Sequence, residues 1–156
     1  NKALESFQIF IDTYPNSTKI EEANKHYKEL RYKLEKKHFE IAKTYYRTAD
    51  YDLRNYKASI QAFDNLLSDY LGSEFKEEAL FYRLKAAHDF VLKSYDRRKP
   101  ERIKDAIEAY QKLKRNFPES KFMEDSDKML VTLQEEDKRI KAIITEISAI
   151  EETTTK

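Results

Sequence analysis

One pattern of residues occurs three times in this chain, and it restricts the fold more than any other feature. The segments ALESFQIFIDTYPNS, SIQAFDNLLSDYLGS and AIEAYQKLKRNFPES align without gaps. In each segment a small residue is followed four positions later by an aromatic residue, and a second aromatic residue comes seven positions after that. These spacings place the three residues on one face of a helix of about four turns. The pattern therefore predicts the same amphipathic helix three times.

The end of each segment is typical of a helix stop followed by a helix start. Pro15 and Pro118 end the preceding helix, because the residue before a proline is disfavoured in the α region. A serine lies two positions later and suits the N-cap of the next helix; the three serines are Ser17, Ser73 and Ser120. Apolar periodicity then predicts longer helices over residues 19–50, 74–95 and 121–150. We expect six helices and no strands.

The composition favours a helical protein without catalytic activity. The 156 residues include one glycine and three prolines, which leaves few turn residues for strands and hairpins. Charged residues make up 38% of the chain but balance to +1, so bulk charge predicts no binding to nucleic acid. Cysteine is absent, the three histidines lack metal-binding spacing, and no phosphate loop or nucleophile elbow occurs. We predict neither an enzyme nor a metal or cofactor site.

The repeated helix resembles the tetratricopeptide repeat, in which a small residue, an aromatic four positions on and a proline eight further on recur. The resemblance implies an all-α, right-handed superhelical solenoid of tetratricopeptide-like helical hairpins. We expect the repeat domain to cover residues 1–139, and residues 140–156 to form the end of the last helix and a polar tail. The repeats are longer than the usual ~34 residues, with extra length in the first helix of each pair. The matching residues are Ala3, Phe7 and Pro15, Ala106, Tyr110 and Pro118, and less completely Ser59, Phe63 and Leu71.

The long first helices, the junction YPNS with EEA after it, and the segment EEALFYRLKAA are similar to the BamD family. BamD proteins are tetratricopeptide lipoproteins that assemble β-barrel proteins at the bacterial outer membrane. The resemblance covers residues 3–133 and corresponds to the C-terminal half of the family. It implies a periplasmic scaffold that docks onto the POTRA domains of the barrel insertase and onto accessory lipoproteins. The chain begins with the second helix of a repeat pair. We therefore expect the lipid anchor to lie on missing upstream sequence, and we expect this anchor to be the one contact with the membrane.

Two other functions remain open from the sequence. The chain is alternatively a periplasmic repeat protein of another cell-envelope complex, or a repeat domain appended to an envelope enzyme. A lipid-attachment cysteine in the upstream sequence would favour the BamD interpretation, and a catalytic domain there would favour the enzyme interpretation.

The first candidate contact lies in the expected groove. Tetratricopeptide arrays bind partners along a concave surface lined by the first helix of each pair. The residues expected to face this groove suit an acidic or aromatic peptide, and they are Phe39, Lys43, Tyr46 and Arg47. The alternative is that these basic side chains simply cover packed aromatic rings at the surface.

Two further candidates come later in the chain. A dense basic patch in an expected loop suits an acidic protein surface or lipid headgroups, and consists of Arg97, Arg98 and Lys99. Its alternative is an ordinary exposed loop. The last helix carries isoleucines at heptad spacing, Ile140, Ile144 and Ile147. They either cap their own domain or dock a partner chain.

Overall fold

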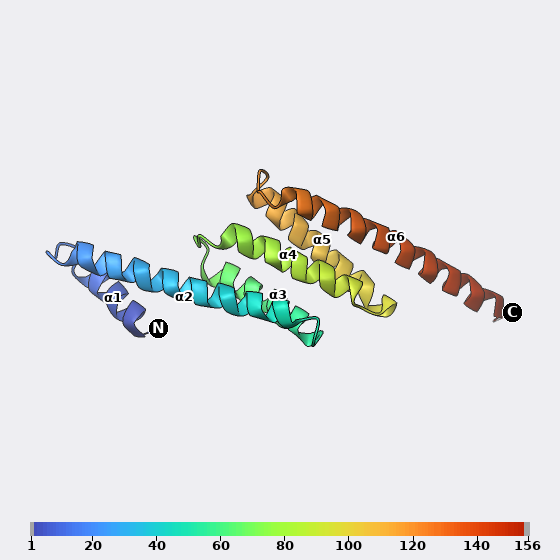
Figure 1. The fold of residues 1–156 in the computed structure, drawn as a ribbon, viewed down its shortest axis with the longest axis horizontal. Coiled ribbons are helices and arrows are strands. Elements are labelled where there is room, and N and C mark those ends of the chain that lie inside the picture. Colours follow the sequence, from blue (N-terminus) through green and yellow to red (C-terminus); the bar gives the residue numbers. More distant parts are fainter. Residues whose placement is uncertain (1, 155–156) are drawn as a thin grey trace.

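The computed structural model describes residues 2–154, with side chains described as far as residue 147. Within this range the chain forms six α-helices and one 3-10 turn, and no strand. The expectation of an all-α chain of helical hairpins is confirmed (Figure 1). The elements are α1 (Lys2–Thr13), α2 (Ile20–Thr48), α3 (Arg54–Asp69), α4 (Lys76–Leu92), η1 (Asp96–Arg98), α5 (Lys99–Asn116) and α6 (Met123–Thr154).

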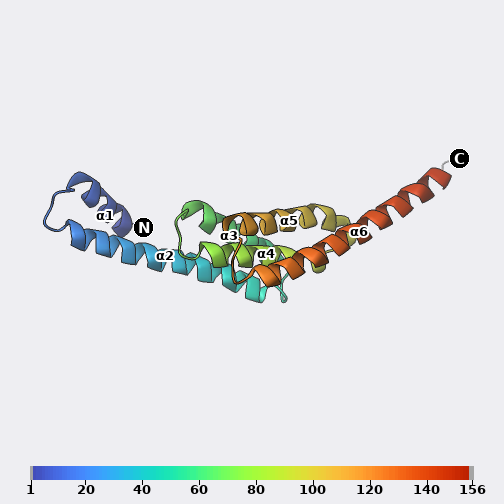
Figure 2. The same cartoon turned by 90° about the horizontal axis from the view of Figure 1, so that it is seen from above.

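Each helix packs against the next helix along the chain. In addition, α4 contacts both α2 and α6, which are its next neighbours but one along the chain. Helices α2, α4 and α6 therefore form one layer, and α1, α3 and α5 form a second layer against it (Figure 2). Helix α6 is the longest and extends past the rest of the array toward the C-terminus (Figure 1). The boundary expected at residues 139/140 lies inside this helix.

The three serines lie at the junctions between hairpins but cap a different position from the one expected. Each hydroxyl accepts a hydrogen bond from the backbone N–H two residues later, at 3.1–3.2 Å. Each serine carbonyl accepts a bond from the N–H three residues later, at 2.9–3.1 Å. The helices begin three residues after the serines, so the hydroxyls cap the turn that leads into each helix. Lys19 and Phe75, and not the serines, occupy the N-cap positions of α2 and α4.

The core confirms the small-residue and aromatic pattern in two of the three repeats. Ser59 is buried where α3 meets α2, and its hydroxyl donates a 2.9 Å hydrogen bond to the carbonyl of Ala42. Phe63, four residues later, is fully buried, and Ala106 and Tyr110 repeat the arrangement in α5. In α1 none of residues 2–13 is buried. The reason is that α1 packs mainly on α2 and lacks the second neighbour that covers α3 and α5.

The segment expected to form a loop around the basic patch, residues 96–101, is helical in the structure. Helix α4 ends at Leu92, η1 follows, and α5 starts at Lys99. Pro100 lies in the first turn of α5, where its missing N–H costs nothing and its fixed φ suits a helix. Arg97 and Arg98 therefore lie in the 3-10 turn η1, and Lys99 is the first residue of α5.

Candidate protein-interaction surfaces

Phe39 was expected to face the groove, and the structure corrects this. The side chain is only 2% exposed and belongs to the main core cluster. Its ring stacks on Phe75 with centroids 5.2 Å apart and meets Phe63 and Tyr82 edge-on. Phe39 therefore holds α2 to α3 and α4 and is not available to a partner.

Lys43 is largely engaged inside the chain. Its Nζ lies 3.1 Å from Oε1 of Glu78 and 4.6 Å from the ring centroid of Tyr82, so it links α2 to α4. Burial disfavours the charged ammonium, but hydrogen bonds to Glu78 and Tyr82 outweigh burial and raise the pKa of Lys43. A partner that used Lys43 would first have to break this ion pair.

Tyr46 takes part in a polar cluster that the sequence pattern did not predict. Its hydroxyl donates a 2.6 Å hydrogen bond to Oδ2 of Asp89, whose Oδ1 lies 2.8 Å from Nδ1 of His88. Burial and the Asp89 hydrogen bond raise the pKa of Tyr46. Burial opposes ionisation of Asp89, but the bonds from His88 and Tyr46 prevail and lower the pKa of Asp89. Of the four groove candidates, only Arg47 is exposed.

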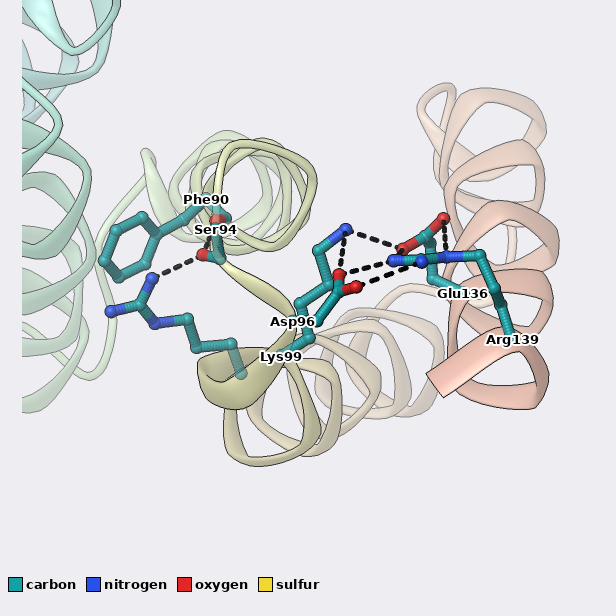
Figure 3. Close-up of polar contacts among 7 residues, drawn as sticks. Phe90, Ser94, Asp96, Lys99, Glu136 and Arg139 are labelled. Carbon is teal, nitrogen blue, oxygen red and sulfur yellow. Dashed lines mark hydrogen bonds and ion pairs between the residues drawn. The ribbon is translucent and has the colours of Figure 1, made fainter. Parts of the chain in front are cut away.

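The basic patch divides into two exposed residues and one buried residue. Arg97 and Arg98 are exposed, but Lys99 is only 7% exposed. Figure 3 shows the Lys99 ammonium between two carboxylates, 2.7 Å from Oε2 of Glu136 and 3.6 Å from Oδ1 of Asp96. Lys99 therefore attaches the start of α5 to α6, and the expectation that it docks a partner is corrected.

Arg139 completes this ion-pair network on the α6 side. Its guanidinium lies 2.6 Å from Asp96 and 3.1 Å from Glu136 (Figure 3). The hydrogen bond from Arg139 is the main reason that the pKa values of Asp96 and Glu136 are lowered, and Lys99 adds to both effects. The network fixes the middle of α6 against η1 and α5.

The isoleucines of α6 differ in their exposure, so the two alternatives left open by the sequence apply to different residues. Ile140 is 3% exposed and packs onto the domain. Ile144 and Ile147 are each 50% exposed, and the C-terminal part of α6 extends past the other helices (Figure 2). Ile140 is therefore a capping residue and no contact for a partner, whereas the two later isoleucines are accessible.

Three exposed arginines from two distant parts of the sequence lie near the end of the molecule where α2 and α4 finish. Nζ of Lys93, just after α4, lies 3.2 Å from Oδ1 of Asp50, just after α2. The two helices thus end at the same place, with Arg47 in the last turn of α2 and η1 shortly after α4. We call the exposed Arg47, Arg97 and Arg98 the basic end. Helical periodicity predicts each helix but not which helix ends meet.

A second feature missed by the sequence is an open groove between α1 and α2. It has a volume of about 640 Å³, and its walls are mostly apolar, with Phe7, Phe10 and Ala23 among them. His26 lies beside Phe7 in this groove, with ring centroids 5.8 Å apart. The partly exposed aromatic positions of the first repeat are the sequence signal that marks it.

The described residues contain neither a metal-binding group of side chains nor a membrane-spanning helix. Among these residues no group of three or more His, Asp or Glu side chains is placed to hold a metal ion. Within residues 2–154, no helix combines the length and apolar character needed to cross a membrane. What the surfaces offer is exposed arginines, half-exposed isoleucines and an apolar groove, which are features suited to contacts with proteins.

The comparisons with known proteins fit this architecture. The family model described as outer membrane lipoprotein, YfiO, matches residues 1–99, which span α1 to the start of α5. A tetratricopeptide repeat model matches residues 93–120, which include η1 and α5. None of the curated proteins matches the chain. Because the first match covers more than half of the residues, the chain belongs to the YfiO family of outer membrane lipoproteins, the BamD family.

Proposed function

We propose that this chain is a non-catalytic scaffold of the machinery that assembles outer-membrane β-barrel proteins. In this proposal it docks onto the POTRA domains of the insertase and onto accessory lipoproteins. The family match over residues 1–99 is the observation that carries the proposal. The family and the repeats support a protein-interaction role in outer membrane assembly, and both are families of non-catalytic scaffolds.

The basic end is the proposed docking site for the insertase. Arg47, Arg97 and Arg98 are exposed, and complementary charge steers protein partners together and fixes their orientation. Arg98 has only a weak internal partner, since its Nη1 lies 3.8 Å from Oε1 of Glu101 and both side chains are about two-thirds exposed. An exposed pair of this kind contributes little, so a carboxylate of a partner can replace it.

The distal part of α6 is the second proposed contact. Ile144 and Ile147 present half-exposed apolar side chains in the C-terminal part of α6, and such side chains gain free energy when a partner covers them. We assign this segment to an accessory lipoprotein. We place the protein at the periplasmic face of the outer membrane, within a longer lipoprotein whose lipid is its one membrane contact.

A calorimetric titration with the soluble POTRA array of the same organism's insertase tests the proposal. We expect saturable binding that weakens at least about tenfold, equal to roughly 1.4 kcal/mol, when the basic end is changed to Arg47→Glu, Arg97→Glu and Arg98→Glu. The matched control reverses three exposed lysines elsewhere, Lys28→Glu, Lys36→Glu and Lys112→Glu. Absence of binding by the folded native chain would overturn the docking proposal. Equal losses in both triple variants would overturn the assignment to the basic end.

A further inference from the structure

We propose that a second binding site, the Arg102 pocket, takes an acidic side chain of a partner peptide together with an apolar neighbour of that side chain. The pocket lies where α3, α4 and the first turn of α5 meet and has a volume of about 360 Å³. Its walls include Lys57, Ile60, Ala87, Phe90, Arg102 and Asp105. Its α5 side, with Arg102 and Asp105, lies after residue 99, where the YfiO match ends, and the proposal does not depend on docking to the insertase.

Arg102 is held in place by neutral groups. Its guanidinium carbon lies 3.7 Å from the ring centroid of Phe90, and one of its N–H groups donates to the hydroxyl of Ser94. That hydroxyl in turn donates to the carbonyl of Phe90, and Figure 3 shows Ser94 beside Phe90 near the end of α4. The guanidinium plane is therefore fixed before any ligand arrives, and a fixed fork loses less entropy on binding a carboxylate.

Arg102 lacks the carboxylate that a partly buried arginine in a protein usually has. Among residues with described side chains, none places a carboxylate oxygen within 4 Å of it, whereas Arg83 nearby lies between Asp64 and Asp105. Burial lowers the pKa of Arg102, which is the sign of a cation that has lost water without gaining an anion. Asp105, the acidic side chain on the second turn of α5, is already engaged by Arg83 at 2.7 Å, whereas Glu101 makes only the weak 3.8 Å contact with Arg98.

The surroundings of Arg102 favour an incoming anion in two further ways. Arg102 lies in the first turn of α5, where the helix dipole disfavours a cation and favours an anion. Lys57 lines the α3 side of the same pocket, and no ion pair involving it occurs among the described residues. The site therefore offers two cations to one carboxylate.

The same pocket selects a peptide carboxylate over a phosphate group. Ile60, Ala87 and the rest of the Phe90 ring provide an apolar lining next to the guanidinium, which suits the methylenes of an acidic side chain and an apolar neighbour. Asp105 and Glu101 border the pocket, and their charges repel a dianion more than a monoanion. The ligand class is thus a protein segment with Asp or Glu beside an apolar residue.

The test uses the Nε–H signals of arginine in ¹⁵N NMR spectra of the intact chain. The probe is the peptide acetyl-Leu-Glu-Leu-amide, and its neutral counterpart is acetyl-Leu-Gln-Leu-amide. We expect the Arg102 signal to shift saturably with the acidic peptide, with a Kd of about 1 mM or tighter. The glutamine peptide should bind at least about tenfold more weakly, because a neutral amide loses the charge-assisted bonds.

Two variants and one competitor make the outcome decisive. Arg102→Lys keeps the charge but loses the planar guanidinium and should weaken binding. Arg115→Gln, which removes an exposed arginine from the last turn of α5, should leave binding unchanged. If a variant does not fold, the Arg102 signal of the native chain, titrated with the acidic and the glutamine peptide, still tests the proposal. No saturable shift, or equal shifts with the glutamine peptide, would overturn the proposal. Inorganic phosphate binding as tightly as the acidic peptide would identify a general anion site and overturn it as well.

Discussion

The change Phe39→Ala tests whether α2 presents its aromatic residues to a partner or to the core. Phe39 is 2% exposed and packs on aromatic rings from three other positions, Phe63, Phe75 and Tyr82. Removing the ring leaves a cavity where α2, α3 and α4 meet, because the neighbouring helices are themselves fixed by their other contacts. The variant should therefore lose stability, whatever it does to binding.

The size of the loss follows from this packing. Replacing a buried phenylalanine with alanine typically costs about 3–5 kcal/mol, and each aromatic pair adds roughly 0.5–1.5 kcal/mol beyond the buried area. Because the ring of Phe39 makes three such contacts, we expect more than the low end of that range and predict a decrease of about 4 kcal/mol in the free energy of unfolding. For a chain of this size the Tm should fall by roughly 8–16 °C.

Urea unfolding followed by far-UV circular dichroism measures this decrease directly. The matched control is Tyr45→Ala, on the same helix but 40% exposed, which should cost less than about 1 kcal/mol because surface substitutions are usually mild. A loss below about 1 kcal/mol for Phe39→Ala, similar to the control, would refute the reasoning. Such a small loss would mean that the side chain of Phe39 is exposed in the folded chain.

Three further predictions concern the other contacts. Ser59→Leu should lower the free energy of unfolding by roughly 1–3 kcal/mol, because the larger side chain forces α3 away from Ala42; an unchanged urea midpoint would contradict this. Lys99→Met leaves the Glu136 carboxylate without its ammonium and should speed amide exchange in α6, and adding Glu136→Leu should restore slow exchange. The pKa values of Asp96 and Glu136 are lowered on folding, so their stabilisation is complete above about pH 4.5 and is lost as the pH falls through the lowered values. A ¹³C titration that places the Glu136 carboxyl midpoint above its usual value would contradict this assignment.

The sequence predicted the helices well because their signals are local. Small residues, aromatics and prolines at fixed spacing define α1, α3 and α5 with little reference to the rest of the chain. Pro100 also marked a helix start that was interpreted as a loop, although proline is common in the first turn of a helix.

The candidate site was harder to predict because its geometry depends on contacts between distant residues. Periodicity places Phe39 and Arg47 on α2 but does not say that α3 and α4 cover one and leave the other exposed. Lys99 looked like part of an exposed basic run because its partner Glu136 is 37 residues away. The unpaired state of Arg102 depends on Arg83 engaging Asp105, which only the packed helices reveal.

Hydrogen–deuterium exchange of the chain, with and without the soluble POTRA array, tests the central claim of a scaffold that docks through its basic end. We predict slower exchange in the last turns of α2 and in residues 93–99, with little change in α1. Exchange that slows only in α1 and the groove beside it, or in no part of the folded chain at saturating POTRA concentration, would contradict the account.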